Sequence, residues 1–519
     1  MDSIRFAENR IFSTRYDIMK IRDLFEHHGV LGNPFSDEDA QNDVVFKSHC
    51  VKTSFHTAWD KIYGNPAEPA TSIVFGEKGS GKTALRLQMV RMLTEYNTDH
   101  PESRPVVVDY ADWNPFIDRF RHRFPRGRKI QKVFSRWELW DHLDAILSLG
   151  TTQLVDRILE PGQTSHAAAV DVKPLPVGKL NPHQVRDLLL LASCYDTSRS
   201  ENPINRWNRL SKALRYRTWK SLFMNNREGL LGIFGTIILV VVDFKWAGGL
   251  GFLKNSWFYF FLLLLWVPLL WKMSQRFFKA WSLRRSLRVL PHTNGELFKV
   301  LMRLQKTDFN GMPFPVSGST DNRYEMLSKF LGVCDTLGLS GLIVLVDRVD
   351  EPYLVNGSPE LEKLLVWPIL DNKLLKHERV GLKLLLPDQL LHFMERESGE
   401  FHQRARLDKQ NLVKSLDWTG ESLFDLANDR LKACADDDRS PTITDFFDPA
   451  VDRRELVSAF AELKVPRHLF KFLYGLFGQH VNEHTEADPV WTVSEATFKS
   501  ALKLYLRDRA AAERNLGVV

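Results

Sequence analysis

Cysteine is scarce in this chain of 519 residues. The four cysteines lie far apart in the sequence and form no C-x-x-C pair; they are Cys50, Cys194, Cys334 and Cys434. This spacing argues against a disulfide framework and a cysteine-based zinc site, and it favours reduced thiols in the core of a cytosolic protein. The first ten residues also lack an apolar run after a basic start, so no secretory signal is expected.

Acidic residues are absent from two segments of an otherwise mixed chain, whose net charge is +6. Between Arg206 and Arg227 lie seven Lys/Arg residues and no acid, and between Lys272 and Arg288 lie six more, again without an acid. Without these cations the rest of the chain would be net acidic. The basic character of the protein therefore belongs to two short segments.

Charge of either sign is absent from two apolar runs that lie between the basic segments. Gly229–Val242 has fourteen residues and Ser256–Trp271 has sixteen. Each run is shorter than the ~20 residues of a typical membrane-spanning helix. Their adjacency, the aromatic residues towards the ends of the second run and the basic outer flanks nevertheless favour a hairpin in the cytoplasmic membrane, with both termini in the cytoplasm. The alternatives are a pair of buried helices or a re-entrant hairpin.

Three closely spaced glycines mark the segment Gly76–Thr83, which reads GEKGSGKT. It fits the phosphate-binding pattern G-x-x-x-x-G-K-[ST] at each required position. A β-branched and aromatic run, Thr71–Phe75, precedes it, and good helix formers, Ala84–Met89, follow it. The sequence therefore predicts a strand, a glycine-rich turn and a helix, which is the structural context that this motif requires.

The predicted loop has the chemistry of a nucleotide site. Glycines lack a Cβ, so the backbone can turn its N–H groups inward, and the following helix adds the positive end of its dipole. We expect Lys82 to contact the β- and γ-phosphates and to assist catalysis, and the Thr83 hydroxyl to bind Mg²⁺. The predicted nucleotide-binding residues of the loop are Gly76, Glu77, Lys78, Gly79, Ser80, Gly81, Lys82 and Thr83.

Three further apolar runs are typical of strands in a parallel sheet: Pro105–Tyr110, Leu342–Val346 and Val380–Leu386. The second of them leads into Asp347, and Asp350 and Glu351 follow. A carboxylate at the carboxyl end of a strand that neighbours the phosphate-loop strand is placed to bind a metal ion. We therefore predict Asp347 as a Mg²⁺ ligand and Asp350 or Glu351 as the catalytic group that polarises water, with the longer Glu351 as first choice.

Arginine and aromatic residues alternate in Phe116–Phe134. Such interleaving can bind nucleic acid, because bases stack on aromatic rings and phosphates pair with arginines. The alternatives are a solvated helix face with its loop, or a surface for an acidic partner. Nucleic acid is the less favoured interpretation.

The combined pattern resembles P-loop NTPases of the additional-strand, catalytic-glutamate division. The run Asp347–Glu351 is similar to the D-x-h-D-E motif of the STAND and KAP families, and a membrane hairpin between the two motifs is typical of the KAP family. Leu416–Trp418 and Val465–Arg467 are similar to parts of the helical lid of AAA+ and KAP proteins, which implies that Arg467 contacts the nucleotide as a sensor-2-like residue. Arg348 departs from the family pattern, because KAP proteins usually carry an acid at this position.

The resemblance implies ATP and Mg²⁺ as cofactors, ATP hydrolysis, and a homo-oligomer in which a neighbouring subunit supplies an arginine. Some relatives act in phage exclusion, a role that rests on the resemblance alone. The leading hypothesis is a membrane-tethered ATPase switch with an unidentified protein partner. The alternatives are an ATP-gated scaffold that hydrolyses poorly and a soluble ATPase that depends on nucleic acid.

The expected fold is α/β: a P-loop NTPase parallel sheet flanked by helices, with an inserted α-helical membrane hairpin and a C-terminal helical lid. The expected boundaries are 1–65 for an N-terminal helical lead-in, 66–200 for the first part of the core, 201–290 for the hairpin with its basic flanks, 291–418 for the second part of the core, and 419–519 for the lid.

Overall fold

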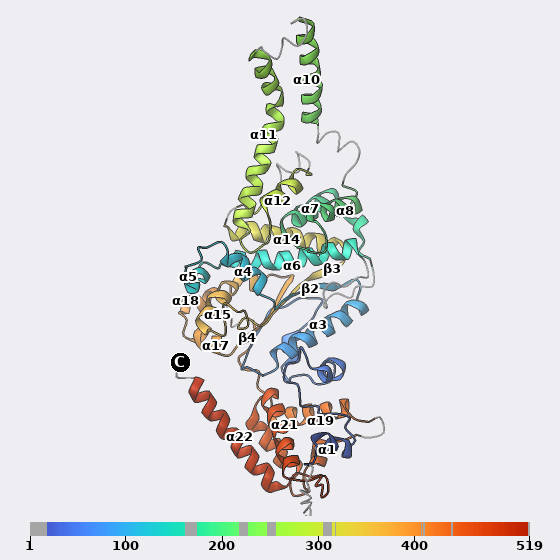
Figure 1. Ribbon diagram of the computed structural model, residues 1–519, viewed down its shortest axis with the longest axis vertical. Coiled ribbons are helices and arrows are strands. Elements are labelled where there is room, and N and C mark those ends of the chain that lie inside the picture. The colour runs from blue at the N-terminus through green and yellow to red at the C-terminus, as the bar shows by residue number, and fades with distance from the viewer. Residues whose placement is uncertain are drawn as a thin grey trace, which may run out of the picture. The chain divides into compact units, whose positions relative to one another are not determined.

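The structure is a computed structural model (Figure 1) that describes residues 18–160, 174–216, 227–246, 256–304, 314–316, 318–405, 407, 410–436 and 440–516. The chain divides into two compact units. Unit 1 comprises Met1–Trp59, Gly76–Gln88 and Ser415–Val519, and unit 2 comprises Asp60–Phe75 and Met89–Lys414. Helix α3 (Lys82–Asp99) begins in unit 1 and ends in unit 2.

A five-stranded parallel sheet flanked by helices forms the centre of unit 2, and its strand order is β2-β3-β4-β1-β5. The strands are β1 (Ser72–Gly76), β2 (Arg104–Tyr110), β3 (Leu339–Val346), β4 (Val380–Pro387) and β5 (Asn411–Val413). The first four are almost entirely buried, as their near-continuous apolar sequences predict. The predicted parallel α/β sheet is thus confirmed.

The strand that leads into Asp347 does not neighbour the phosphate-loop strand, so this prediction was wrong. β3 pairs with β2 and β4, and β4 lies between β3 and β1. β4 approaches the chain before β1 closely: a Cβ on Gly381 would lie 2.8 Å from the carbonyl oxygen of Ala70. β1 and β3 still end at the same edge of the sheet, about 10 Å apart by strand spacing.

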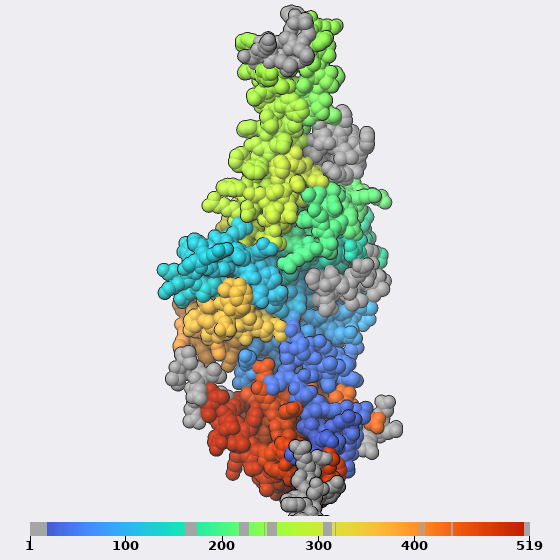
Figure 2. Space-filling model, in the orientation of Figure 1, coloured from blue at the N-terminus to red at the C-terminus, as the bar shows by residue number. Residues whose placement is uncertain are grey.

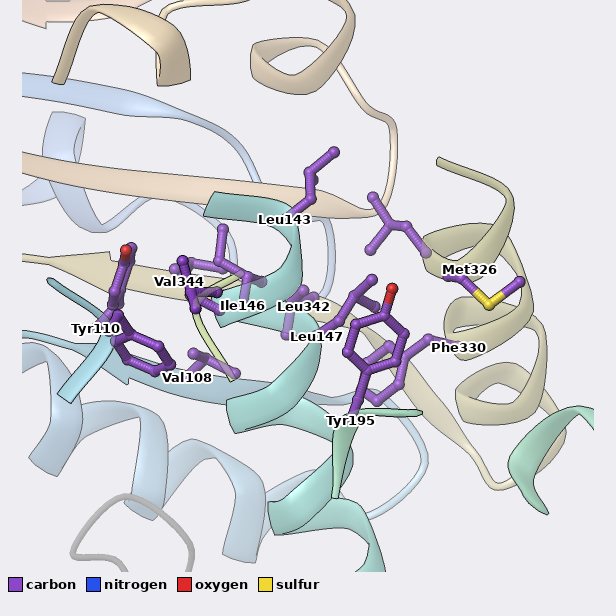
Figure 3. Close-up of a cluster of buried hydrophobic side chains, with 14 of the residues drawn as sticks. Val108, Tyr110, Leu143, Ile146, Leu147, Tyr195, Met326, Phe330, Leu342 and Val344 are labelled. Atoms are coloured by element: carbon purple, nitrogen blue, oxygen red, sulfur yellow. The ribbon is translucent and has the colours of Figure 1, made fainter. Parts of the chain in front are cut away.

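Two helices pack over β2 and β3 on the side of the sheet that faces α10 and α11 in Figure 1: α6 (Leu139–Leu159) and α14 (Thr320–Thr336). A third helix, α7 (Pro182–Tyr195), packs against both of them. Figure 3 shows how their side chains meet the strands, with Phe330 and Tyr195 beside the apolar residues of α6. Gly150 of α6 allows this close packing, because a Cβ there would lie 3.1 Å from the Phe330 ring.

The remaining helices of unit 2 surround this core and carry its surface. They are α4 (Asn114–Arg121), α5 (Ile130–Phe134), α8 (Pro203–Ala213), α12 (Asn294–Leu301), α15 (Pro359–Val366), α16 (Asn372–Leu375), α17 (Gln389–Glu395) and α18 (Gly399–Ala405), with 3₁₀ turns at Val177–Lys179 and Trp367–Ile369. Helix α2 (Trp59–Tyr63) lies at the start of the unit.

Two long helices, α10 (Arg227–Trp246) and α11 (Ser256–Ser286), extend away from the sheet and run in opposite directions (Figure 1). A Cβ on Gly235 of α10 would lie 2.6 Å from Leu265 of α11, so the two helices pack closely at this small residue. Among the described residues, Trp257–Ser286 is the one helical segment long and apolar enough to cross a membrane, and Glu228–Val242 is a shorter apolar one. The predicted connection between the helices lies outside the described residues.

Unit 1 is mostly helical and has its own hydrophobic core. Its helices are α1 (Ile21–His27), α19 (Gly420–Ala433), α20 (Arg453–Leu463), α21 (Pro466–Asn482) and α22 (Glu495–Leu516), with a π-helical turn at Phe46–Cys50 and a 3₁₀ turn at Ile443–Phe446. Phe25 of α1 packs against Phe446 and Phe477 at ring-centroid distances of 5.4 and 5.5 Å. The N-terminal and C-terminal segments therefore share one core.

Candidate functional site

The phosphate-loop segment has the backbone that its glycines predict. β1 leads into residues 76–81, and α3 begins at Lys82. Gly79 and Gly81 have φ values of +98° and +95°, in the left-handed region that disfavours a side chain. The main-chain N–H of Leu85 donates to the oxygen of Gly81 over 2.8 Å, which closes the first turn of α3. The loop thus ends at a helix N-terminus, where free N–H groups favour an anion.

The ammonium group of Lys82 lies over the start of its own loop. Its Nζ donates hydrogen bonds to the carbonyl oxygens of Gly76, over 2.7 Å, and Glu77, over 3.0 Å. Lys82 and Thr83, the first two residues of α3, are both half-buried. The ammonium group is thus held at the loop by two main-chain oxygens.

Arg467 lies directly against the loop within unit 1. Its main-chain N–H donates to the oxygen of Gly79 over 3.4 Å, and a Cβ on Gly79 would lie 2.6 Å from its Cβ. The guanidinium Nε is 3.6 Å from Oε2 of Glu38, and Lys471 is 3.4 Å from the same oxygen. The loop, Arg467 and Glu38 therefore form one charged cluster at the beginning of α21.

Two other residues of unit 1 contact the loop, and the sequence did not identify either contact. The sequence places Trp418 in a lid motif; in the structure its Nε1 donates to the carbonyl oxygen of Ser80 over 2.9 Å. Arg509 of α22 is 3.7 Å from Oε2 of Glu77. No local pattern predicts these contacts, because more than 300 residues separate Trp418 from Ser80.

The rings of Trp418 and His56, both in unit 1, meet at a steep angle. The two ring centroids are 5.2 Å apart, and His56 Nε2 lies 2.9 Å from the main-chain oxygen of Asp417. Burial lowers the pKa of His56. A neutral, packed imidazole fits a structural role in holding the Trp418 segment.

The predicted acidic residues lie in unit 2, on the turn that follows β3. Asp347 is 1% exposed, and its main-chain oxygen accepts a hydrogen bond of 2.9 Å from Trp113 Nε1. Arg348 has a φ of +59°, which is unusual for a residue other than glycine. Glu351 is exposed and pairs with Arg348 at 3.2 Å, while the main-chain oxygen of Asp350 accepts from the N–H of Gly357 over 3.0 Å.

The structure therefore brings Lys82, Thr83 and Arg467 into one cluster of unit 1 and holds Asp347, Asp350 and Glu351 on one turn of unit 2. Among the described residues, no group of three or more His, Cys, Asp or Glu side chains is arranged to hold a metal ion. A site that uses one hydroxyl and one carboxylate, with phosphate oxygens and water as the other ligands, does not require such a group.

Comparisons with known protein families, with curated proteins and with solved structures find no match to this chain.

Proposed function

We propose that the protein is a membrane-tethered P-loop ATPase that works as a nucleotide-driven switch. The observation that carries the proposal is the loop itself. Two left-handed glycines, a helix N-terminus and a lysine bound across the loop occur together at residues 76–83. This combination fits a phosphate-bearing ligand, because it offers several N–H donors and one cation to an anion.

The acidic turn supplies the second half of the proposed chemistry. Thr83 and Asp347 are the candidate ligands of Mg²⁺, which would neutralise charge on the β- and γ-phosphates. Asp350 or Glu351 would orient the attacking water and accept its proton. The support is topological: β1 leads into the loop, β3 leads into Asp347, and both strands end at the same edge of one sheet.

The contacts of the loop with residues 418 and 467 suggest how nucleotide would act as a switch. Arg467 shares Glu38 with Lys471, and a bound γ-phosphate would compete with that carboxylate for the guanidinium. Movement of Arg467 would be transmitted to α21, since the residue lies in the first turn of that helix. Hydrolysis would return Arg467 to Glu38.

ATP turnover by the purified full-length protein tests the proposal, with Lys82→Ala compared against Lys432→Ala. Lys432 is an exposed lysine of α19 in the same unit, so its substitution leaves the loop intact and changes charge equally. We expect Lys82→Ala to lose about 100-fold or more of turnover, and Lys432→Ala to keep most of it. Thermal unfolding of both variants shows whether they fold. Equal turnover in wild type and a folded Lys82→Ala variant would refute the proposal.

One observation favours a second candidate, an ATP-gated scaffold with little hydrolysis. Glu351 is paired with Arg348, the residue that departs from the family pattern, so its carboxylate is engaged within its own turn. The variant Glu351→Gln separates the two functions. A hydrolase would keep its ATP affinity and lose turnover, whereas a scaffold would match wild type in both measurements.

The membrane tether is proposed for α10 and α11. Large apolar side chains are exposed along both helices, among them Leu231, Phe234, Trp257, Leu263 and Trp271. An exposed apolar surface of this extent is typical of lipid contact or of a large interface. We propose that the two helices form the inserted hairpin, with both termini in the cytoplasm, and that the protein forms homo-oligomers. Extraction with carbonate and high salt tests insertion: release of the protein into the supernatant would exclude it.

A further inference from the structure

One basic segment of unit 2 is not used by the proposed ATPase. Between Asp118 and Glu138 the chain has eight Lys/Arg residues and no acid. The segment covers the end of α4, the loop after it and α5. We call the exposed lysines and arginines of residues 119–136, together with Arg284 and Arg285 at the end of α11, the basic rim.

Most aromatic residues of this segment are buried. Phe120 and Phe134 are fully buried, and Phe116 and Trp137 are 9% and 3% exposed. Arg121 is also structural, because its guanidinium donates to main-chain oxygens of the following loop, including that of Arg126 over 2.6 Å. Phe124 is the partly exposed ring of residues 116–137, and Arg128 and Arg136 lie over it. The basic rim therefore offers mainly positive charge, with few rings on which the bases of a single-stranded nucleic acid would stack.

The basic rim is fixed to the end of α11. Arg123 donates to the main-chain oxygens of Arg284, over 2.7 Å, and Leu287, over 3.2 Å. Arg288 donates to Asp141 and lies 3.7 Å from the centroid of the Trp140 ring. Figure 2 shows the cyan segment as a shoulder beside the yellow-green stalk that α11 forms. The same helix thus carries an apolar surface at one end and holds the basic rim at the other.

The cations of the basic rim are not neutralised within the part of the chain that the structure describes. None of them forms an ion pair with a described carboxylate, whereas Lys272, nearer the apolar part of α11, pairs with Glu228 at 3.1 Å. Arg276 donates to the oxygens of Met302 and Leu304. The charges towards the apolar end are satisfied internally, and those at the base of the helix remain available to an external anion.

The length of α11 is consistent with an apolar part inside the membrane and a basic end at its surface. A hydrocarbon core of about 30 Å takes about 20 helical residues, so a crossing that starts at Trp257 ends near Arg276. The exposed rings of Phe277, Phe278 and Trp281 then fall in the interfacial layer, where aromatic residues are enriched. Arg284 and Arg285 follow within a further turn, at the depth of the lipid phosphates.

We propose that the basic rim binds the anionic phospholipid headgroups of the cytoplasmic leaflet and so sets the distance between the sheet of unit 2 and the membrane. The inference rests on the proposed insertion of α10 and α11. Attraction to an anionic surface falls off within a Debye length, so a cluster fixed at the end of the membrane helix is well placed to use it.

Fluorescence quenching in nanodiscs tests this inference on the full-length protein. A fluorophore on Gln131→Cys, exposed in α5, reports on the basic rim, and one on Leu264→Cys, exposed in α11, reports on insertion. The discs contain either neutral phosphatidylcholine or a mixture with phosphatidylglycerol, and carry a spin label on the headgroup or in the acyl chain. The basic-rim variant carries three substitutions, Arg126→Glu, Lys129→Glu and Lys132→Glu. The control variant makes the same change of charge elsewhere on unit 2, with Lys376→Glu, Arg396→Glu and Lys414→Glu.

We expect headgroup quenching at Gln131 to be stronger in anionic than in neutral discs, to weaken in the basic-rim variant, and to stay unchanged in the control variant. Equal quenching in neutral and anionic discs, or full quenching of the basic-rim variant, would overturn the inference. So would tight binding of a labelled oligonucleotide by the basic rim without lipid quenching. Acyl-chain quenching at Leu264 separates the two proposals: its absence refutes insertion, and its presence without quenching at Gln131 refutes only the lipid-binding rim.

Discussion

Trp113 donates a hydrogen bond of 2.9 Å from its Nε1 to the main-chain oxygen of Asp347. Trp113 is 1% exposed and stacks on Tyr110, the last residue of β2, with ring centroids 4.5 Å apart. The chain that follows β2 therefore holds the turn that follows β3. If Asp347 binds a metal ion, Trp113 acts as a positioning residue for it.

Replacing Trp113 by Phe tests this positioning. The variant keeps most of the ring and removes the N–H donor, so we expect a loss of about 1 kcal/mol of stability and a fall in ATP turnover that exceeds any fall in ATP affinity. Steady-state turnover, nucleotide titration and thermal unfolding measure the three effects.

Trp367→Phe is the matched control for this prediction. It removes an indole hydrogen bond of the same length, 2.9 Å to Oε1 of Glu397, from the same unit. We expect a similar loss of stability with normal turnover. If both variants lost turnover alike, the effect would come from general destabilisation of unit 2 and the positioning role would be wrong.

The two left-handed glycines of the loop have different surroundings, and this difference predicts different effects of alanine. At Gly81 the nearest atom to an added Cβ is Cζ2 of Trp418 at 3.9 Å, so Gly81→Ala meets backbone strain alone. At Gly79 an added Cβ would also lie 2.6 Å from the Cβ of Arg467, so a steric clash adds to the backbone strain. Strain of this kind costs on the order of 1–3 kcal/mol, and we expect Gly79→Ala to cost clearly more than Gly81→Ala.

Thermal unfolding of the two variants, with Gly178→Ala as a control, measures this difference. A Cβ on Gly178 would meet no atom within 4 Å, and its φ is ordinary, so the control should be close to neutral. Nucleotide titration adds a second measurement, since displacement of Arg467 would weaken ATP binding in Gly79→Ala. Equal unfolding temperatures for the two loop variants would contradict the close contact between Gly79 and Arg467.

The strands were predictable because each is a local apolar run. Leu342–Val346 and Val380–Leu386 lie within β3 and β4, with only the ends shifted. Their order was not predictable, since it depends on pairings between distant segments. β4 follows β3 in the chain and pairs with it, yet it also lies beside β1. Lys383 of β4 in addition donates to the main-chain oxygens of Ile62 and Tyr63 in α2, over 2.7 and 3.0 Å.

The C-terminal end of α11 was not predictable from the sequence for a related reason. The uncharged run stops at Trp271, but α11 continues to Ser286, because Lys272 pairs with Glu228 and Arg276 donates to Met302 and Leu304. A pattern of charges along the sequence does not reveal which of them are satisfied by a distant segment.

In the candidate site, too, the features that depend on neighbouring residues were predictable and the contacts between distant segments were not. The loop residues 76–83 follow from a contiguous motif, whereas the contacts of Glu38, Trp418 and Arg509 with the loop or with Arg467 join segments far apart in the chain. The roles of the predicted site residues stay predictions, and the variants described above test them.

His142 predicts a measurable pH dependence of stability. Its side chain is fully buried in α6, with Nε2 2.7 Å from the main-chain oxygen of Leu365, and burial lowers its pKa from 6.5 to about 4. The folded protein therefore keeps a neutral imidazole at a pH where the unfolded chain already binds a proton. Stability from this group is fully present above pH 6.5 and is lost as the pH falls towards 4.

The variant His142→Gln isolates this contribution, because Asp141, Asp144, Arg288 and Arg323, which lie nearby, are unchanged in it. Between pH 8 and pH 5 we expect wild type to lose about 2 kcal/mol more stability than the variant does. His122→Gln, which removes an exposed histidine, should follow wild type across this range. Unfolding monitored by tryptophan fluorescence at pH 8, 6.5 and 5 gives the comparison. Parallel curves for wild type and His142→Gln would mean that His142 accepts a proton in the folded state as readily as in the unfolded one, which its burial among aromatic rings argues against.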